Sequence, residues 1–217
     1  EFRRVLFRSL QMSRINGVGV NSAVMTVTYV MFLIGALVKA GAIPGHSWIP
    51  TASESAPASV MAYLPASLDK LLGIYLLARI SLDMFVLSQG LKVLLLIIGA
   101  VTIILAVMMA LLQHNLKKLL AFHAVSQVGY MVMGIGTGVP IGIIGGLFHM
   151  LNNAIYKCCL FLGAGAVEKS AGTTELEELG GLSKAMPVTF IAMLVSALAI
   201  SGVPPLNGFA SKWLIYQ

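Results

Sequence analysis

Charged residues are scarce in this chain. Of its 217 residues only 10% are Asp, Glu, Lys or Arg, whereas 58% are hydrophobic and the mean hydropathy is +0.92. A soluble domain carries about 25% charged residues, so no soluble core could hide this much apolar surface. Most apolar runs approach the ~20 residues that a membrane-spanning helix requires. We therefore predict an all-α, polytopic transmembrane helix bundle in the cell membrane, with the lipid bilayer as its solvent.

Acidic residues are the rarer sign of charge, with 8 Asp and Glu against 14 Lys and Arg, for a net charge of +6. An excess of this kind can indicate nucleic-acid binding. Here, however, four arginines crowd the first fourteen residues, namely Arg3, Arg4, Arg8 and Arg14. The rest of the chain is close to balanced, so we expect no nucleic-acid partner.

Cysteine is almost absent, which excludes several kinds of site. The two cysteines, Cys158 and Cys159, are neighbours in an apolar segment, and neighbours on a helix point in different directions, which disfavours a disulfide or a metal site. An iron–sulfur cluster needs about four thiolates. The glycine run 134–146 follows no strand, so it is not a dinucleotide site. We expect no cofactor and no metal bound by this chain.

The two ends of the chain suggest an internal piece of a longer protein. Glu1–Ser9 has no start methionine and no helical pattern, and it lacks the apolar run of a targeting peptide. We interpret residues 1–14 as artefactual or disordered. Residues 15–217 then form part of one transmembrane domain, and the chain stops inside an apolar run without a helix stop signal.

Six apolar segments and the start of a seventh follow one another. They cover residues 18–40, 57–79, 91–112, 117–137, 141–167 and 185–203, and then 206 to the end. Two interruptions look alike, because each places proline, glycine, tryptophan and a lysine close together: Lys39, Pro44, Gly45 and Trp48 in one, and Pro204, Pro205, Gly208, Lys212 and Trp213 in the other. Paired interruptions of this kind are typical of discontinuous helices in transporters built from repeats.

The longest polar connection, 168–186, predicts a small surface helix that begins with a capping box formed by Thr174 and Glu177. Positive charge is denser in alternate loops, which places the 41–56, 113–118 and 168–186 connections on the cytoplasmic side.

Four lysines lie in or beside different apolar segments: Lys39, Lys70, Lys157 and Lys212. A charge at the centre of a bilayer costs roughly 2.5–3.5 kcal/mol on insertion scales, so it is rarely present without a function. Several in series predict a path for ions. The alternatives are that Lys39 and Lys212 reach the membrane surface, and that Lys70 or its neighbour Asp69 forms a static ion pair with another helix.

Two polar stripes accompany these lysines. His149, Asn153 and Lys157 are spaced i, i+4 and i+8, so they share one helix face. A second stripe occupies the preceding segment: His123, Ser126, Gln127 and Tyr130. Such stripes could hold water between ionisable groups, or they could join helices by hydrogen bonds. The sequence leaves both interpretations open.

Several motifs resemble one family of membrane proteins. They include LVKAGAIPGHSWIP at 37–50, LDKLLGIY at 68–75, NLKKLLAFHAVSQVGY at 115–130 and SGVPPLNGFASK at 201–212. These motifs are similar to the proton-conducting antiporter-like membrane subunits. Such subunits occur in NADH-quinone oxidoreductase (complex I), in energy-converting hydrogenases and in Mrp-type sodium/proton antiporters.

The resemblance implies two inverted five-helix repeats, each with one broken helix, and assigns roles to the ionisable residues. Lys39 and Lys212 match the family's ionisable residues on the two broken helices, and Lys70 and Lys157 match the connecting lysines. His123 and His149 match positions along a hydrated axis, with Asp69 as a supporting residue. Asn153 stands where some relatives have histidine. A glutamate on a helix upstream of Lys39 has no counterpart here.

The implied function is proton translocation through buried lysines and histidines, coupled to other membrane and redox subunits. In that case the chain is the non-redox, ion-translocating subunit of an oxidoreductase complex. The alternative is a subunit of a sodium/proton antiporter without redox coupling, for which the same lysines would serve. A structural scaffold is a third possibility, but deep lysines are a costly way to join helices.

Overall fold

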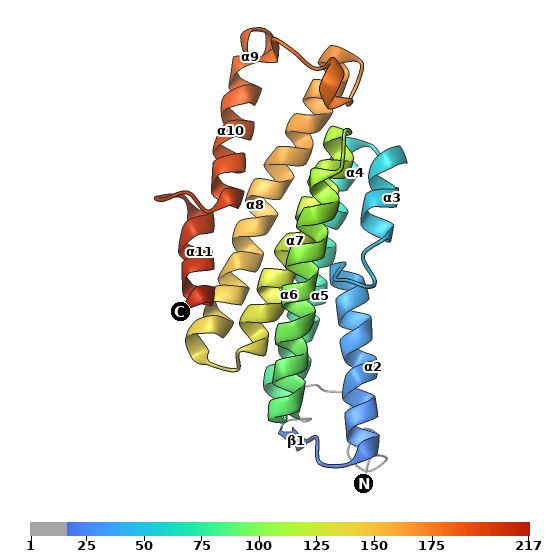
Figure 1. Ribbon diagram of the computed structural model, residues 1–217, viewed down its shortest axis with the longest axis vertical. Helices are drawn as coiled ribbons and strands as arrows, with labels where there is room; N and C mark the ends of the chain where they lie inside the picture. Colours follow the sequence, from blue (N-terminus) through green and yellow to red (C-terminus); the bar gives the residue numbers. More distant parts are fainter. Residues whose placement is uncertain (1–16) are drawn as a thin grey trace.

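The computed structural model describes residues 17–217 and consists almost entirely of helices (Figure 1). In chain order they are α2 (Ala23–Ala40), α3 (Trp48–Ser55), α4 (Ala58–Tyr63), α5 (Asp69–Ala78), α6 (Gln89–Leu111), α7 (Leu116–Gly136), α8 (Pro140–Ala171), α9 (Leu182–Ala185), α10 (Pro187–Ser201) and α11 (Asn207–Tyr216). Two π-helical turns, Leu64–Leu68 and Arg79–Met84, precede and follow α5. Strands β1 (Val18–Gly19) and β2 (Phe85–Val86) pair in parallel. The segment 1–14 lies outside the described residues.

Among residues 17–217, five helical spans are long and apolar enough to cross a membrane: α2, the continuous span Ala58–Met84, α6, α7 and α8. The shorter α10 is also apolar. These elements coincide with the predicted apolar segments, and α11 corresponds to the seventh. The prediction of an all-α, multi-pass membrane protein is therefore confirmed.

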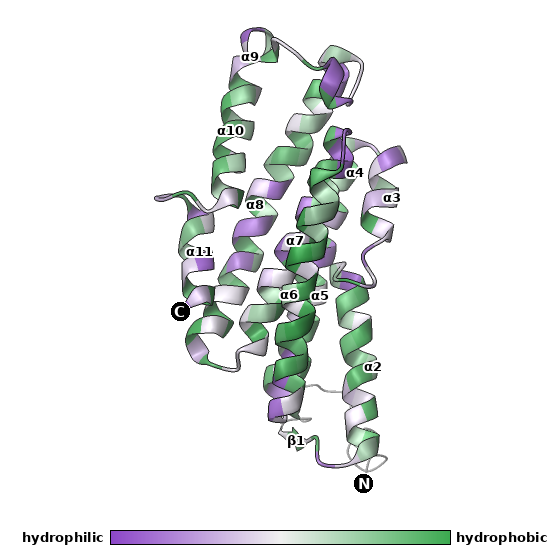
Figure 2. Ribbon diagram, viewed as in Figure 1, coloured by the Kyte–Doolittle hydropathy of each residue, from purple (hydrophilic) through white to green (hydrophobic). Residues whose placement is uncertain are grey.

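Helix α7 forms the centre of the bundle. In its most apolar 18-residue stretch 72% of the residues are buried, whereas the corresponding share is 28% in α2 and in α6. Glycines allow its close contact with α6. A Cβ atom added at Gly129 would lie 2.6 Å from the carbonyl oxygen of Gly99, too close for any side chain. Many large hydrophobic side chains of the helices are exposed, whereas hydrophilic bands interrupt α8 and α11 partway along their length (Figure 2). Polar groups are thus gathered between helices rather than facing lipid.

Two broken helices share the same cap. Gly41 ends α2 with φ 80°, and Gly202 ends α10 with φ 85°, a left-handed conformation that glycine adopts without steric cost. In both, the residue after the glycine donates its backbone N–H to the carbonyl five residues earlier, at 2.9 and 3.1 Å. A cis X–Pro bond follows in each break, at Pro44 and at Pro205. The predicted discontinuous helices are therefore present.

The two broken helices run in opposite directions. In Figure 1 the pair α2–α3 rises from the lower end of the bundle, whereas α10–α11 descends from the upper end, and both breaks lie near mid-height. An inverted repeat requires this antiparallel arrangement. Because the breaks are at mid-height, the residues beside them lie far from both ends of the bundle.

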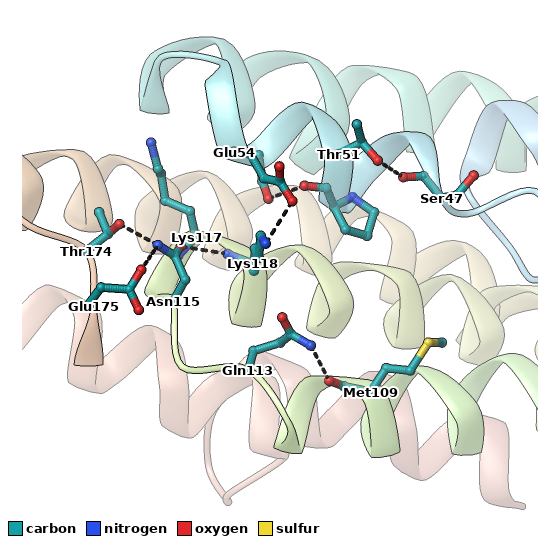
Figure 3. A network of polar contacts seen from close by, with 12 residues as sticks. Ser47, Thr51, Glu54, Met109, Gln113, Asn115, Lys117, Lys118, Thr174 and Glu175 are labelled. Carbon is teal, nitrogen blue, oxygen red and sulfur yellow. Dashed lines mark hydrogen bonds and ion pairs between the residues drawn. The ribbon is translucent and has the colours of Figure 1, made fainter. Parts of the chain in front are cut away.

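One end of the bundle carries a polar network that joins three segments (Figure 3). Asn115 caps α7 by accepting bonds from the backbone N–H groups of its first turn, at 3.0 and 3.3 Å. Its amide nitrogen also donates to Thr174 Oγ1 at 2.7 Å and to Glu175 Oε1 at 2.8 Å. Lys118 pairs with Glu54 of α3 at 2.8 Å. The three connections assigned to one side by their charge thus meet at the same end.

The predicted surface helix with its capping box is wrong. Only a three-residue 3₁₀ turn, Leu176–Glu178, and the four-residue α9 form in this connection, and the 3₁₀ turn has no side-chain cap. Thr174 bonds to Asn115 instead, and Glu177 pairs with His114 at 2.9 Å. The capping box does not form, because both of its residues bind side chains at or just before the start of α7.

Candidate functional site

Two of the four predicted lysines are fully enclosed by the bundle. Lys70 on α5 is 1% exposed and Lys157 on α8 is 0% exposed. Lys157 Nζ donates a hydrogen bond to the carbonyl oxygen of Leu120 on α7, at 3.0 Å. Lys70 Nζ has no hydrogen-bond partner among residues 17–217, although it lies close enough to Lys157 for the two charges to interact. Neither amine forms an ion pair with a carboxylate within the described part of the chain.

A π-helical turn, Leu64–Leu68, leads directly into the segment that carries Lys70. Widened turns of this kind leave carbonyl groups open to other donors and occur frequently at functional sites. Here Ser67 Oγ donates to the carbonyl of Ala154 on α8 at 3.3 Å, and Asn153 Nδ2 donates to that of Ala66 at 3.4 Å. Asn153 Oδ1 is buried and has no hydrogen-bond partner within the described part of the chain. Asn153 therefore joins α8 to the turn before Lys70, which was one of the two interpretations left open.

Asp69 pairs with Lys39 of α2 rather than with its neighbour Lys70. The side chain of Asp69 is 16% exposed and that of Lys39 is 48% exposed, so this ion pair lies at the edge of the bundle. Lys39 occupies the last turn of α2, just before the break. Of the alternatives considered for Lys70 and Asp69, an ion pair with another helix is therefore observed for Asp69, and its partner is Lys39.

His149 lies at the centre of a buried network. Its Nδ1 is 2.8 Å from Ser211 Oγ on α11, and its Nε2 is 3.0 Å from Gln127 Oε1 on α7. The Tyr156 hydroxyl is 3.4 Å from both Gln127 Oε1 and His149 Nε2. The ring of Tyr130 packs edge-on against His149, with 5.6 Å between ring centroids. The network joins α7, α8 and α11.

Lys212 spans the break of the second broken helix. Its Nζ donates at 2.6 Å to the carbonyl of Ile200, in the last turn of α10. The same amine lies 4.9 Å from the ring centroid of Tyr130, a cation–π contact. The first break has a matching contact, since Trp48 Nε1 donates at 3.0 Å to the carbonyl of Val38. In each broken helix, a side chain of the second half binds a backbone carbonyl in the last turn of the first half. The Val38 carbonyl also accepts from the backbone N–H of Gly41, at 3.1 Å.

His123 lies between the other ionisable groups. Its side chain is half-buried and has no hydrogen bond to residues 17–217. It is close enough to Lys157 and to Lys212 for its charge to interact with each of theirs. The ionisable residues thus follow one another across the bundle, from the Lys39–Asp69 pair to Lys212. Residue patterns had not singled out Ser211, Tyr156, Asn152 or Asn207. The spacing of Asn207 and Ser211, i and i+4 on the helix of Lys212, is the signal that was available.

Among residues 17–217, no group of three or more His, Cys, Asp or Glu side chains is arranged to hold a metal ion. Cys158 and Cys159 are both free and half-buried.

Comparison with known proteins identifies the family. Residues 5–217 match the family described as NADH:quinone oxidoreductase/Mrp antiporter, transmembrane. The chain is 39% identical over 202 residues to formate hydrogenlyase subunit 3 of Escherichia coli, an alignment that covers 87% of this chain and 33% of that protein. It is 36% identical over 205 residues to Na⁺/H⁺ antiporter subunit A1 of Staphylococcus epidermidis, covering 88% of this chain and 25% of the relative.

A solved structure gives the same result. The fold matches the Mrp complex from Dietzia sp. DQ12-45-1b with a TM-score of 0.91 and 28% identity, over 98% of this chain and 40% of that one. This chain therefore spans between a quarter and two fifths of the proteins it was matched to. By its sequence and its fold, it belongs to the transmembrane subunits of the NADH:quinone oxidoreductase/Mrp antiporter family.

Proposed function

We propose that the protein to which these residues belong translocates protons across a membrane, and that Lys70 and Lys157 are the central carriers. The observation that supports this most is the burial of both amines without a carboxylate partner among residues 17–217. An uncompensated charge in a dry interior is costly, so each amine has reason to release its proton when its surroundings change. A static structural role would be served better by a paired or neutral side chain.

Neighbouring charges supply the coupling in this proposal. At an effective dielectric constant of about 20, unit charges about 10 Å apart interact by roughly 1.7 kcal/mol, which exceeds one pKa unit. Loading a proton on Lys157 therefore disfavours one on Lys70, and the reverse. His123 and Lys212 extend the same series toward the second broken helix, and the Lys39–Asp69 pair extends it toward the first.

The proposed partners are other membrane subunits and a redox subunit. Formate hydrogenlyase subunit 3 is, by its name, one subunit of a formate hydrogenlyase, whereas the chain described here offers few redox groups, with two free cysteines. In our proposal, electron transfer takes place elsewhere and acts on Lys39 and Asp69 through charge or movement at the first break. No cofactor is bound by this chain in the proposal.

Sodium/proton antiport without redox coupling is the second candidate. It is favoured by the likeness to an Na⁺/H⁺ antiporter subunit and to the Mrp complex. The same lysines would carry the proton, so the two candidates differ in the driving force and not in this site.

The test uses the full-length subunit, assembled with its native partners in inside-out membrane vesicles. Proton uptake is followed with a pH-sensitive dye, first with an electron donor and then with an imposed sodium gradient. Redox coupling predicts uptake with the donor alone, and antiport predicts proton movement with the sodium gradient alone. The variant Lys70→Met should reduce either activity by at least ~100-fold, the usual contribution of a positioned proton-transfer group.

Lys169→Met is the matched control, because Lys169 is exposed near the end of α8. It should keep the activity of the unchanged protein. Full proton uptake by an assembled Lys70→Met variant would refute the central role of Lys70.

A further inference from the structure

The imidazole of His149 is held from both sides by side chains of other helices. His149 and Ser211 are each 0% exposed, and Gln127 is 4% exposed. Nδ1 of His149 lies 2.8 Å from Ser211 Oγ, and Nε2 lies 3.0 Å from Gln127 Oε1. Both ring nitrogens thus have a side-chain hydrogen-bond partner. When the ring gains or loses a proton, these partners must change which group donates and which accepts.

The Gln127 side determines which nitrogen carries the hydrogen of the neutral ring. Gln127 Nε2 donates to Ser126 Oγ at 3.2 Å, which orients Oε1 toward His149. An amide oxygen only accepts, so Nε2 of His149 must be the donor. This tautomer, assigned from the hydrogen-bond network, makes Nδ1 an acceptor. The Ser211 hydroxyl therefore donates to Nδ1 when the ring is neutral.

The Ser211 hydroxyl has a second place to donate. Its Oγ lies 3.2 Å from the carbonyl oxygen of Gly208 and 3.4 Å from that of Asn207, both in the first turn of α11. When His149 is charged, both ring nitrogens are donors. Ser211 Oγ then accepts from Nδ1, and its own hydrogen turns to the carbonyl of Gly208. Every group keeps a partner in both states, which neither an apolar side chain nor a pure acceptor at this position would allow.

Helix α11 is anchored so that this exchange has a fixed geometry. Asn152 Nδ2 donates to the carbonyl of Asn207 at 3.0 Å, and Asn207 Nδ2 donates to Asn152 Oδ1 at 3.1 Å. A Cβ atom at Gly145 of α8 would lie 3.0 Å from the backbone of Ile215, so the two helices are in close contact. A change in the direction of the hydroxyl therefore acts on the first turn of α11 and not on its position as a whole.

Three ionisable groups face His149 from the elements packed against it. Tyr130 comes from α7, Tyr156 from α8 itself, and Lys212 from α11, close enough for its charge to act on the ring. Lys212 follows Ser211 directly in the chain. The hydroxyl is thus the direct hydrogen-bonded link between the ring and the first turn of α11, which precedes the turn that carries Lys212.

We propose that Ser211 is a positioning residue whose hydroxyl reverses its hydrogen-bond direction when His149 gains or loses a proton. In this way the charge of His149 on α8 is transmitted to the first turn of α11. This inference rests on the proposed proton translocation, and it adds a residue that senses the occupancy of the path.

The experiment uses the complete complex in vesicles and measures proton uptake between pH 5.5 and 8.5. In Ser211→Ala the charged ring loses its only acceptor at Nδ1, so the charged state is disfavoured more than the neutral one. The alkaline limb of the pH profile should move about one pH unit lower, a roughly ten-fold loss of rate on that limb. Ser211→Thr keeps the hydroxyl and should stay within about two-fold of the unchanged protein.

Ser201→Ala is the matched control, because Ser201 Oγ donates only to a carbonyl of its own helix, that of Ala197 at 2.8 Å. Its pH profile should not change. If Ser211→Ala does not assemble, Ser211→Cys takes its place, since a thiol is a weaker donor and acceptor of similar size; a smaller shift in the same direction is expected. An unchanged profile in the assembled Ala or Cys variant overturns the proposal.

Infrared difference spectra of the purified complex separate this proposal from the proposed function. The histidine band that disappears in His149→Ala reports the protonation of this ring as the pH is varied, whether or not protons are transported. Ser211→Ala should move that transition by about one pH unit. If Lys70→Met leaves transport intact while the band still moves, the proposed function fails and the role of Ser211 stands. If Lys70→Met abolishes transport and the band does not move in Ser211→Ala, the proposed function stands and the role of Ser211 fails.

Discussion

Replacing Lys157 by methionine separates a transport role from a structural one. The Lys157 side chain is 0% exposed and makes one hydrogen bond, to the carbonyl of Leu120 at 3.0 Å. Methionine has a similar length and no charge, so it should fill the same space. The lost hydrogen bond costs about 1 kcal/mol, whereas removing a buried charge relieves a desolvation penalty of several kcal/mol. Assembly and thermal stability should therefore be unchanged or improved.

Transport should respond in the opposite way. Without an amine at this position, no proton can be held between Lys70 and His123, and we expect a loss of at least ~100-fold. The roughly 1.7 kcal/mol of repulsion that Lys157 exerts on a charge about 10 Å away also disappears, which changes the ratio of charged to neutral Lys70 by about twenty-fold.

The assay is proton uptake by the reconstituted full-length complex, with native gel electrophoresis as the measure of assembly. Lys184→Met is the control, because Lys184 lies exposed in α9. Unchanged transport in an assembled Lys157→Met complex would refute the relay. Loss of assembly together with transport would refute the energetic argument, because it would show that the buried amine stabilises the bundle.

Two further predictions concern the scaffold. Gly208→Ala should lower both the thermal stability of the complex and its transport rate, because the new Cβ would overlap the carbonyl of Ala199 at the second break. Such overpacking costs about 1–3 kcal/mol. The control Gly180→Ala, which has open space around it, should leave the melting temperature unchanged. Asn115→Ala should destabilise by about 1–2 kcal/mol through loss of the α7 cap, measured as a lower melting temperature, with Gln113→Ala as the control that should stay within about 0.5 kcal/mol.

Much of the fold could be predicted from the sequence, because the lipid-facing character of a helix is a local property. Apolar runs of about the length of a bilayer define spans without reference to other segments. The two breaks were also visible, since Gly41 and Gly202 end helices by adopting a positive φ and proline follows closely. The family motifs then indicated which lysines of this chain match the ionisable residues of the family.

Local patterns failed where a distant segment supplied a partner. Thr174 and Glu177 have the spacing of a capping box, but Thr174 bonds to Asn115 and Glu177 pairs with His114 instead. Tertiary packing also decided between alternatives that the sequence left open, since Asp69 stands next to Lys70 in the chain and pairs with Lys39 on another helix, thirty residues away. Neighbours on a helix point apart, whereas packed helices bring remote side chains together.

The sequence by itself determined a membrane-embedded helical bundle, two broken helices and a series of lysines in apolar surroundings, because composition, run length and glycine–proline chemistry act locally. Only the tertiary structure decided that Lys70 and Lys157 are enclosed without a paired carboxylate from the described residues, and that His149 on α8 contacts Ser211 on α11. The physical reason is that the cost of a buried charge and the direction of a hydrogen bond depend on which other segments surround the group.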